Sequence, residues 1–164
     1  MREIRVYRKG SFAPYIILVD EDNYEFLSRF NWRIIRRSFT LNHVATVIDG
    51  KTVYMHQLVL PCPNKTIQVE HANNNGLDNR RSNLRLSTQS QNMANKGSQD
   101  NNTSGYRGVS FHKRAKSWRA YITCKGVTQH LGLFRTSKEA AKAYNKAALT
   151  HFGEFAKINE VSDD

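Results

Sequence analysis

The chain has 164 residues and a mass of 18.9 kDa, and its 25 Lys and Arg against 14 Asp and Glu give a formal net charge of +11. Apolar residues make up 39% of it, and no apolar run approaches the roughly 20 residues of a membrane-spanning helix. The amino terminus has no apolar signal-peptide core, and two cysteines support neither a disulfide framework nor a multi-cysteine zinc site. These features argue against membrane and secreted classes. They favour a cytoplasmic protein that meets a polyanion, nucleic acid before anionic lipid or acidic protein.

The first third of the chain predicts short strands. Residues 6–20 and 32–60 each alternate between apolar and polar side chains and then run apolar. Asp49-Gly50 lies between two apolar runs and predicts a hairpin turn. Residues 20–32 predict a short helix between the two strand segments.

The composition changes after Pro61 and Pro63. IQVEH, residues 67–71, predicts a strand, and an Asn-rich loop follows it. Residues 80–95 predict helix in part. Residues 96–104 are polar and rich in Gly, Asn and Ser, which predicts a linker.

The last segment begins at Gly105 and shows three strand-like runs, with a turn at Lys125-Gly126. Residues 101–138 hold eight basic and no acidic side chains, with aromatic residues between them. Such a stretch is either a solvated face or a nucleic-acid-binding surface. We favour the second, because phosphates need cations and aromatic rings stack on bases.

A helix is predicted from Thr136 to His151. Thr136 and Glu139 have the spacing of a capping box, which satisfies the free N–H groups of a first helical turn. Small apolar residues then recur at helical spacing, and Gly153 is a natural stop.

The residues that suggest chemistry lie in the middle segment. Glu70 and His71 are adjacent at the end of the 67–71 strand, and Asn83 and Asn92 follow. Carboxylate and carboxamide oxygens suit Mg²⁺, and a histidine that titrates near neutrality can deprotonate water. Each residue alone is more often structural, but together they suggest a hydrolytic site.

The stretch from Met55 to Asn95 resembles HNH endonucleases of the phage and intron homing type. It carries His-x-Leu-Val, then acid-His, then an Asn-rich loop with Asn-Leu, then an Asn nine residues later, all in the family's order. The resemblance implies a ββα-metal fold, in which two strands and a helix surround one divalent cation, Mg²⁺ or Mn²⁺.

The resemblance also implies roles. His71 matches the general base that activates the attacking water, and Asn83 matches a residue of the catalytic set that braces the loop carrying the base. Glu70 matches an acidic metal ligand that is more often Asp, and Asn92 matches the helix residue that completes the metal site. His56, from His-x-Leu-Val, is expected to be supporting, either structural or phosphate-facing.

Residues 105–160 resemble the plant APETALA/ethylene-response-factor DNA-binding domain. Tyr-Arg-Gly-Val, Trp-x-Ala-x-Ile, Leu-Gly-x-Phe, Glu-Ala-Ala-x-Ala-Tyr and a closing Asn are all in register. The resemblance implies a three-stranded antiparallel sheet that is backed by one helix and enters the major groove. The plant target sequence does not transfer, because Ser110, Phe111 and His112 stand where plant members carry arginines.

The candidate DNA-binding residues are positively charged or aromatic. Those expected on or near the DNA-facing sheet are Arg107, Trp118 and Arg119. Those expected to reach phosphates are Lys113, Arg114, Lys116, Lys125 and Arg135, together with Arg80, Arg81 and Arg85, for which a solvated helix face is the alternative.

We therefore expect an α+β protein with a strand-rich region over 1–54, an HNH unit over 55–95, a linker over 96–104 and a DNA-binding domain over 105–160. The predicted function is a metal-dependent endonuclease that hydrolyses phosphodiester bonds in double-stranded DNA, as a site-specific nicking homing enzyme. We expect a monomer, with a dimer possible, in the cytoplasm of a bacterial or phage-infected cell. The alternative is a sequence-specific DNA-binding regulator with an inactive HNH site.

Overall fold

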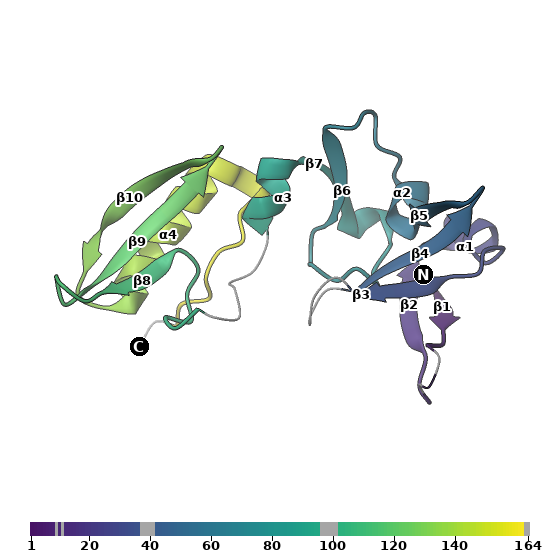
Figure 1. Cartoon of the computed structure of the whole chain (residues 1–164), viewed down its shortest axis with the longest axis horizontal. Coiled ribbons are helices and arrows are strands. Elements are labelled where there is room, and N and C mark those ends of the chain that lie inside the picture. Colours follow the sequence, from purple (N-terminus) through teal and green to yellow (C-terminus); the bar gives the residue numbers. More distant parts are fainter. Residues whose placement is uncertain (9, 11, 37–41, 96–101, 163–164) are drawn as a thin grey trace. The chain divides into compact units, whose positions relative to one another are not determined.

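The structure is a computed structural model that describes residues 1–8, 10, 12–36, 42–95 and 102–162 (Figure 1). It divides into two compact units, unit 1 over 1–89 and unit 2 over 90–164. Helices and antiparallel sheets occur in both, so the predicted α+β class is confirmed. No helix in the described ranges is long and apolar enough to cross a membrane.

Unit 1 begins with small antiparallel sheets. Strands β1 (Arg2–Val6) and β2 (Tyr15–Val19) form a pair. Strands β3 (Arg33–Arg36), β4 (Asn42–Ile48) and β5 (Lys51–Tyr54) form a three-stranded sheet in that order.

The rest of unit 1 consists of short elements along the HNH-like stretch and one helix before it. Helix α1 (Glu21–Leu27) follows β2, and helix α2 (Met55–Val59) follows β5. Strands β6 (Ile67–His71) and β7 (Leu84–Thr88) pair antiparallel, with the short 3-10 helix η1 (Arg81–Asn83) directly before β7.

Two predicted hairpin turns are confirmed. Asp49 and Gly50 join β4 to β5 with φ values of 49° and 74°. In unit 2, Lys125 and Gly126 have φ values of 50° and 79°. Two successive residues with positive φ match the twist of the flanking strands, which is why Asp-Gly and similar pairs favour such turns.

The prediction of strand through residues 55–59 was wrong, because these residues form α2. The oxygen Oε1 of Gln57 accepts the backbone N–H of Tyr54 at 3.3 Å and so satisfies a donor that the first helical turn leaves free. Met55 is fully buried at the start of the helix. The turn of the chain into α2 also buries His56.

One apolar cluster joins the amino-terminal strands to the HNH-like stretch. Ile17, Val19, Leu27 and Met55 are fully buried in it, from β2, α1 and α2. Strand pairs of four or five residues bury little alone, so the shared cluster supplies the core that the small HNH-like elements lack.

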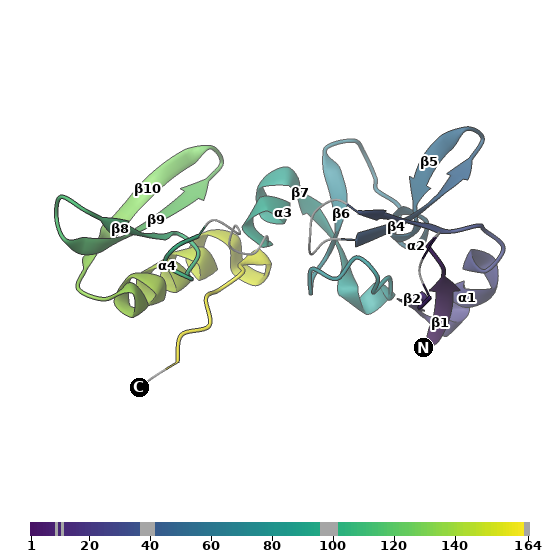
Figure 2. The same cartoon turned by 60° about the horizontal axis from the view of Figure 1, so that its bottom comes forward.

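Unit 2 contains one sheet and one long helix. Strands β8 (Val109–His112), β9 (Ser117–Cys124) and β10 (Val127–Phe134) form an antiparallel sheet in the order β10-β9-β8. Helix α4 (Ser137–Phe152) lies along one face of it (Figure 2), and the 3-10 helix η2 (Gly153–Phe155) follows.

The predicted capping box of α4 is confirmed. The N–H of Glu139 donates to Thr136 Oγ1 at 3.1 Å, and the N–H of Thr136 donates to Glu139 Oε2 at 3.3 Å. Ala140 and Ala148 are fully buried, so the stripe of small residues lets the helix approach the sheet closely. Gly153 ends the helix with a φ of 53°.

Helix α3 (Gln89–Asn95) begins at the boundary and belongs almost wholly to unit 2. The two strands of the expected ββα arrangement are therefore present as β6 and β7, while its assembly with a helix around a metal stays a prediction. Of the expected linker, residues 96–101 lie outside the described residues. Residues 102–104 are held in unit 2 by hydrogen bonds, since Ser104 Oγ donates to the carbonyl of Val109 at 2.8 Å.

Candidate active site

His71 lies at the last position of β6, where the Asn-rich loop begins. Its side chain is buried, with 5% of the residue exposed. Its strand partner is Leu84 at the start of β7. The loop over 72–80 therefore leaves and returns next to the predicted general base.

Asparagine side chains shape this loop. Asn73 Oδ1 accepts the N–H of Asn75 at 2.8 Å, and Asn75 Oδ1 accepts the N–H of Leu77 at 3.1 Å. These bonds between a side chain and the backbone two residues later are Asx turns. Asn74 adopts a φ of 60°, a conformation that Asn tolerates. The many asparagines of this segment are thus explained by their side chains, which form the turns of a tight loop.

Asn83 braces the loop. Its Oδ1 accepts the N–H of Asn73 at 3.1 Å, and its Nδ2 donates to the carbonyl of Asp78 at 2.8 Å. Its own carbonyl accepts the N–H of Ala72 at 2.9 Å. One side chain therefore joins the beginning of the loop to its end, while the place of Asn83 in the catalytic set, which the resemblance implies, stays a prediction.

An ion pair between the buried Asp78 and the half-buried Arg80 holds the end of the loop. Asp78, with 2% of the residue exposed, accepts Arg80 Nε at its Oδ1 and Arg80 Nη2 at its Oδ2, both at 2.7 Å. Asn73 Nδ2 donates to the same carboxylate at 3.1 Å. The hydrogen bond from Arg80 holds the pKa of Asp78 below its ordinary value, although burial opposes this shift.

Asn79 sets the tautomer of His71. Its Nδ2 donates to the carbonyl of Gly76 at 3.2 Å, so its Oδ1 is the atom that lies 3.3 Å from His71 Nε2. A carboxamide oxygen only accepts, so His71 Nε2 carries the hydrogen and Nδ1 carries the lone pair of the neutral ring. The pKa of His71 is lowered by burial, against the effects of Asn79 and Asp78. His71 is therefore neutral at neutral pH, with Nδ1 as its basic nitrogen.

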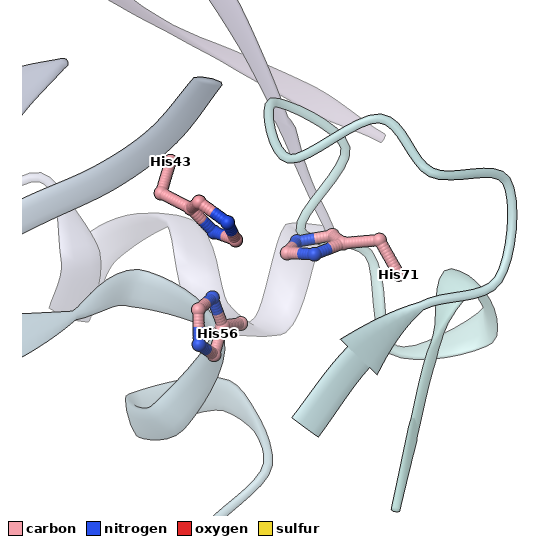
Figure 3. Close-up of side chains that lie close together, drawn as sticks. All are labelled: His43, His56 and His71. Carbon is pink, nitrogen blue, oxygen red and sulfur yellow. The ribbon is translucent and has the colours of Figure 1, made fainter. Parts of the chain in front are cut away.

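Two further histidines lie against His71 (Figure 3). His43 comes from β4 and His56 from α2, and the ring centroids of the three side chains are 5.2–5.8 Å apart. Burial, together with the neighbouring His71 and His43, lowers the pKa of His56 to about 3. The ring of Tyr54 stacks on His56 at an angle of 10° and a centroid distance of 5.4 Å. We call His43, His56 and His71 the histidine cluster.

Glu70 has a different neighbourhood from His71. Consecutive residues of a strand point to opposite faces, so the two side chains diverge. The carboxylate of Glu70 is buried and accepts Nε of Arg85, its partner across β6 and β7. Asn92, the other predicted metal ligand, lies in α3 of unit 2. A metal site formed by Glu70 and Asn92 thus stays a prediction.

The three arginines of the HNH-like stretch have partners inside unit 1. Arg80 pairs with Asp78 and Arg85 with Glu70, while Arg81 Nη1 donates to the carbonyl of Leu84 at 3.2 Å. Their contact with phosphates stays a prediction, and they have a structural role that the sequence did not reveal.

The predicted DNA-binding residues of unit 2 lie in several places. Arg119 is exposed on the sheet face opposite α4, where its Cζ lies 5.4 Å from the ring centroid of Tyr121. The side chain of Trp118, the preceding residue of β9, lies on the other face of the sheet, where it packs on the apolar cluster between the sheet and α4. The predicted phosphate contacts are exposed in or beside the turns of the sheet: Lys113, Arg114, Lys116, Lys125 and Arg135.

Arg107 joins α3 to the start of the sheet. Its guanidinium donates to the carbonyls of Met93 and Ala94, and the latter also accepts the N–H of Lys157 at 3.4 Å. The N–H of Arg107 donates to Asn159 Oδ1 at 2.7 Å, so the closing Asn of the plant-like pattern holds the Tyr-Arg-Gly-Val segment. A DNA contact by Arg107 stays a prediction.

Comparison with known proteins decides the family. The family model described as HNH endonuclease matches residues 61–94. A protein of Acanthamoeba polyphaga mimivirus named as an HNH endonuclease is 30% identical over 158 residues, which cover 93% of this chain and 77% of that protein. The chain belongs to the HNH endonuclease family. The predicted enzyme class is thereby confirmed.

Other relatives match parts of this HNH endonuclease. An ethylene-responsive transcription factor of the APETALA type from Arabidopsis thaliana is 42% identical over 62 residues, 38% of this chain and 13% of that protein. A protein of Escherichia phage T7 is 31% identical over 98 residues, 60% of this chain and 79% of that protein. No solved structure matches the chain.

Two residues beside the predicted base of the HNH endonuclease could not be found from the sequence. His43 precedes the HNH-like stretch and approaches His71 only through the fold. Asn79 is one of several asparagines in the loop, and nothing in its local pattern sets it apart. The available signal was the Asn-rich composition itself, which indicated a loop held by side-chain hydrogen bonds.

Proposed function

We propose that this HNH endonuclease cuts double-stranded DNA in a metal-dependent reaction and nicks one strand at a specific site, as homing endonucleases do. The observation that carries the proposal is the state of His71. The ring is buried and neutral, its Nε2–H is held by Asn79, and Nδ1 carries the lone pair that a general base needs.

The chain's own residues would prepare the base in two ways. Asn79 fixes the orientation and tautomer of His71, and after proton transfer its oxygen would stabilise the imidazolium through the same hydrogen bond. Asn83 and the pair of Asp78 with Arg80 hold the loop that carries Asn79. All four residues would act as positioning residues.

Glu70 and Asn92 would hold one Mg²⁺ or Mn²⁺ ion. Oxygen donors of this kind suit both ions, and pairing with Arg85 does not exclude a metal, since the two oxygens of a carboxylate accept several contacts at once. When bound, the ion supplies positive charge to the scissile phosphate and the leaving oxygen. The carboxylate of Glu in place of Asp reaches one methylene further, which would affect the preferred ion.

Unit 2 would hold the DNA. Arg119 and Tyr121 present a cation and an aromatic ring on the exposed face of its sheet, and exposed lysines and arginines occupy the turns. The likeness of this region to an ethylene-responsive transcription factor supports DNA as the ligand. One HNH site cuts one strand at a time, so a monomer would nick. We place the enzyme in the cytoplasm of a bacterial or phage-infected cell.

The proposal is tested on supercoiled plasmids that carry phage or bacterial genomic inserts. The full chain and Glu70→Gln are incubated with Mg²⁺, Mn²⁺ or EDTA, and the same DNA is used in a gel-shift assay. Glu25→Gln, which makes the same change at an exposed carboxylate of α1, is the matched control.

We expect metal-dependent conversion to open circles by the full chain and by Glu25→Gln, and strongly reduced conversion by Glu70→Gln with an unchanged gel shift. Linear product at the earliest times would contradict nicking. A gel shift without cutting in any metal would support the DNA-binding regulator instead.

A further inference from the structure

The histidine cluster offers three nitrogen donors to one point in unit 1. One ring nitrogen from each of His43, His56 and His71 lies within 4.8 Å of the other two (Figure 3). A tetrahedral ion with metal–nitrogen bonds of about 2.1 Å holds its ligands about 3.4 Å apart, so a modest inward movement of the rings completes the geometry. Because each ring comes from a different element, an ion there would link β4, α2 and β6.

His56 provides the second observation. Only 7% of the residue is exposed, and its Nδ1 has no hydrogen-bond partner within the described part of the chain. A buried nitrogen without a partner costs stability, and a bound ion removes that cost. Stacking on Tyr54 restrains the plane of the ring.

Asn79 provides a third observation that supports a metal site. A histidine that binds a metal through one nitrogen almost always donates its other ring N–H to an oxygen of the protein. His71 shows this arrangement, since its Nε2–H is held by Asn79 Oδ1 and the lone pair belongs to Nδ1. The oxygen of Asn79 is itself fixed by the hydrogen bond of Nδ2 to Gly76.

The chemistry of the donors selects the ion. Metal binding requires the neutral imidazole, and burial keeps His56 neutral at neutral pH. Imidazole nitrogens suit Zn²⁺, Ni²⁺, Cu²⁺ or Fe²⁺, whereas Mg²⁺ takes oxygen ligands. We propose that His43, His56 and His71 bind a transition-metal dication of the Zn²⁺ class, at a site separate from that of Glu70 and Asn92.

Occupation of this site has a consequence for the enzyme, which rests on the proposed function. The lone pair of His71 Nδ1 cannot accept a proton from water while it binds a metal. Zn²⁺ at the cluster therefore inhibits cutting that Mg²⁺ supports.

The test measures binding without using activity. The full chain, freed of metal with EDTA and dialysed, is titrated with Co²⁺, whose visible absorption intensifies when it enters a site of low coordination number. The same titration is made with His43→Gln and His56→Gln, whose folding is checked by circular dichroism and tryptophan fluorescence. Cys62→Ser and His130→Gln are the controls for other soft ligands.

We expect one equivalent of intensely absorbing Co²⁺, displaced by Zn²⁺, in the full chain and both controls, and loss of this absorption in the two cluster variants. Equal absorption in folded cluster variants, its loss in Cys62→Ser, or its absence from the full chain would overturn the site. Zn²⁺ that fills the site without slowing Mg²⁺-dependent cutting would overturn the inhibition. Absence of cutting in every metal would count against the proposed function and the inhibition, while the absorption would still decide the site.

Discussion

Burial of His56 makes unit 1 sensitive to acid. In the folded protein the pKa of His56 is lowered from 6.5 to about 3, mainly by burial and then by His71 and His43. At pH values between these two pKa values, His56 is protonated in the unfolded chain and neutral in the folded chain. The contribution of His56 to the free energy of unfolding is therefore complete when the pH is above 6.5, the ordinary pKa of histidine, and it decreases as the pH falls below that value.

The magnitude follows from linkage. Between about pH 7.5 and about pH 5.5, protonation of this one side chain in the unfolded state costs about 1.4 kcal/mol of unfolding free energy. The cost continues to grow at about 1.4 kcal/mol for each further pH unit until the folded protein also binds the proton. His71, whose pKa is lowered by burial, adds to the loss in the same direction.

The assay compares the full chain with His56→Gln in urea at the two pH values, with EDTA present. Both proteins carry Trp118→Phe, so that Trp32, which donates its indole N–H to Leu27 O at 2.7 Å, reports unfolding of unit 1. Any fixed cost of the Gln side chain cancels, because the measured quantity is the change in unfolding free energy with pH.

His56→Gln should lose about 1.4 kcal/mol less than the full chain between the two pH values. His130→Gln, which leaves the cluster intact, should behave like the full chain. Equal pH dependence of the unfolding free energy in His56→Gln and in the full chain would show that His56 is solvated or protonated in the folded protein, and not buried and neutral.

Three further substitutions test other parts of the structure. Asn79→Ala removes the acceptor for His71 Nε2–H and should slow metal-dependent cutting by up to about 100-fold, with DNA affinity unchanged in a gel shift; equal rates would contradict the orienting role. Gly76→Ala places a methyl group against the carbonyl of Asn42 and should lower the free energy of unfolding of unit 1 by about 1–3 kcal/mol in urea; an unchanged free energy of unfolding would mean that the loop does not approach β4 so closely. Thr136→Ala removes the cap of α4 and should destabilise unit 2 by about 1 kcal/mol in chemical unfolding, whereas no loss would show that the capping box is dispensable.

Features with a local cause could be predicted from the sequence. The turns at Asp49-Gly50 and Lys125-Gly126 depend on residues that tolerate positive φ, and α4 depends on its cap and on small residues at helical spacing. The strand that ends in His71 could also be predicted, because its pattern of apolar residues and the Asn-rich loop that ends it are both local features of the sequence.

Features that depend on distant residues could not be predicted. His43 reaches His71 because β4 and β6 fold together, and no periodicity marks that contact. The pairing of Glu70 with Arg85 depends on the register of β6 and β7, which a single sequence does not fix. Likewise, helical spacing could not show that the end of α3 would be held by Arg107 of unit 2.

We propose that His71 acts as the general base of a metal-dependent DNA endonuclease. The most direct measurement follows the cutting of one plasmid by the full chain and by His71→Ala in Mg²⁺, together with the Kd of each protein for the same DNA. We expect His71→Ala to cut at least about 100-fold more slowly and to bind the DNA with the same Kd. Cutting by His71→Ala within a few-fold of the full chain, at equal Kd, would show that His71 is not the general base.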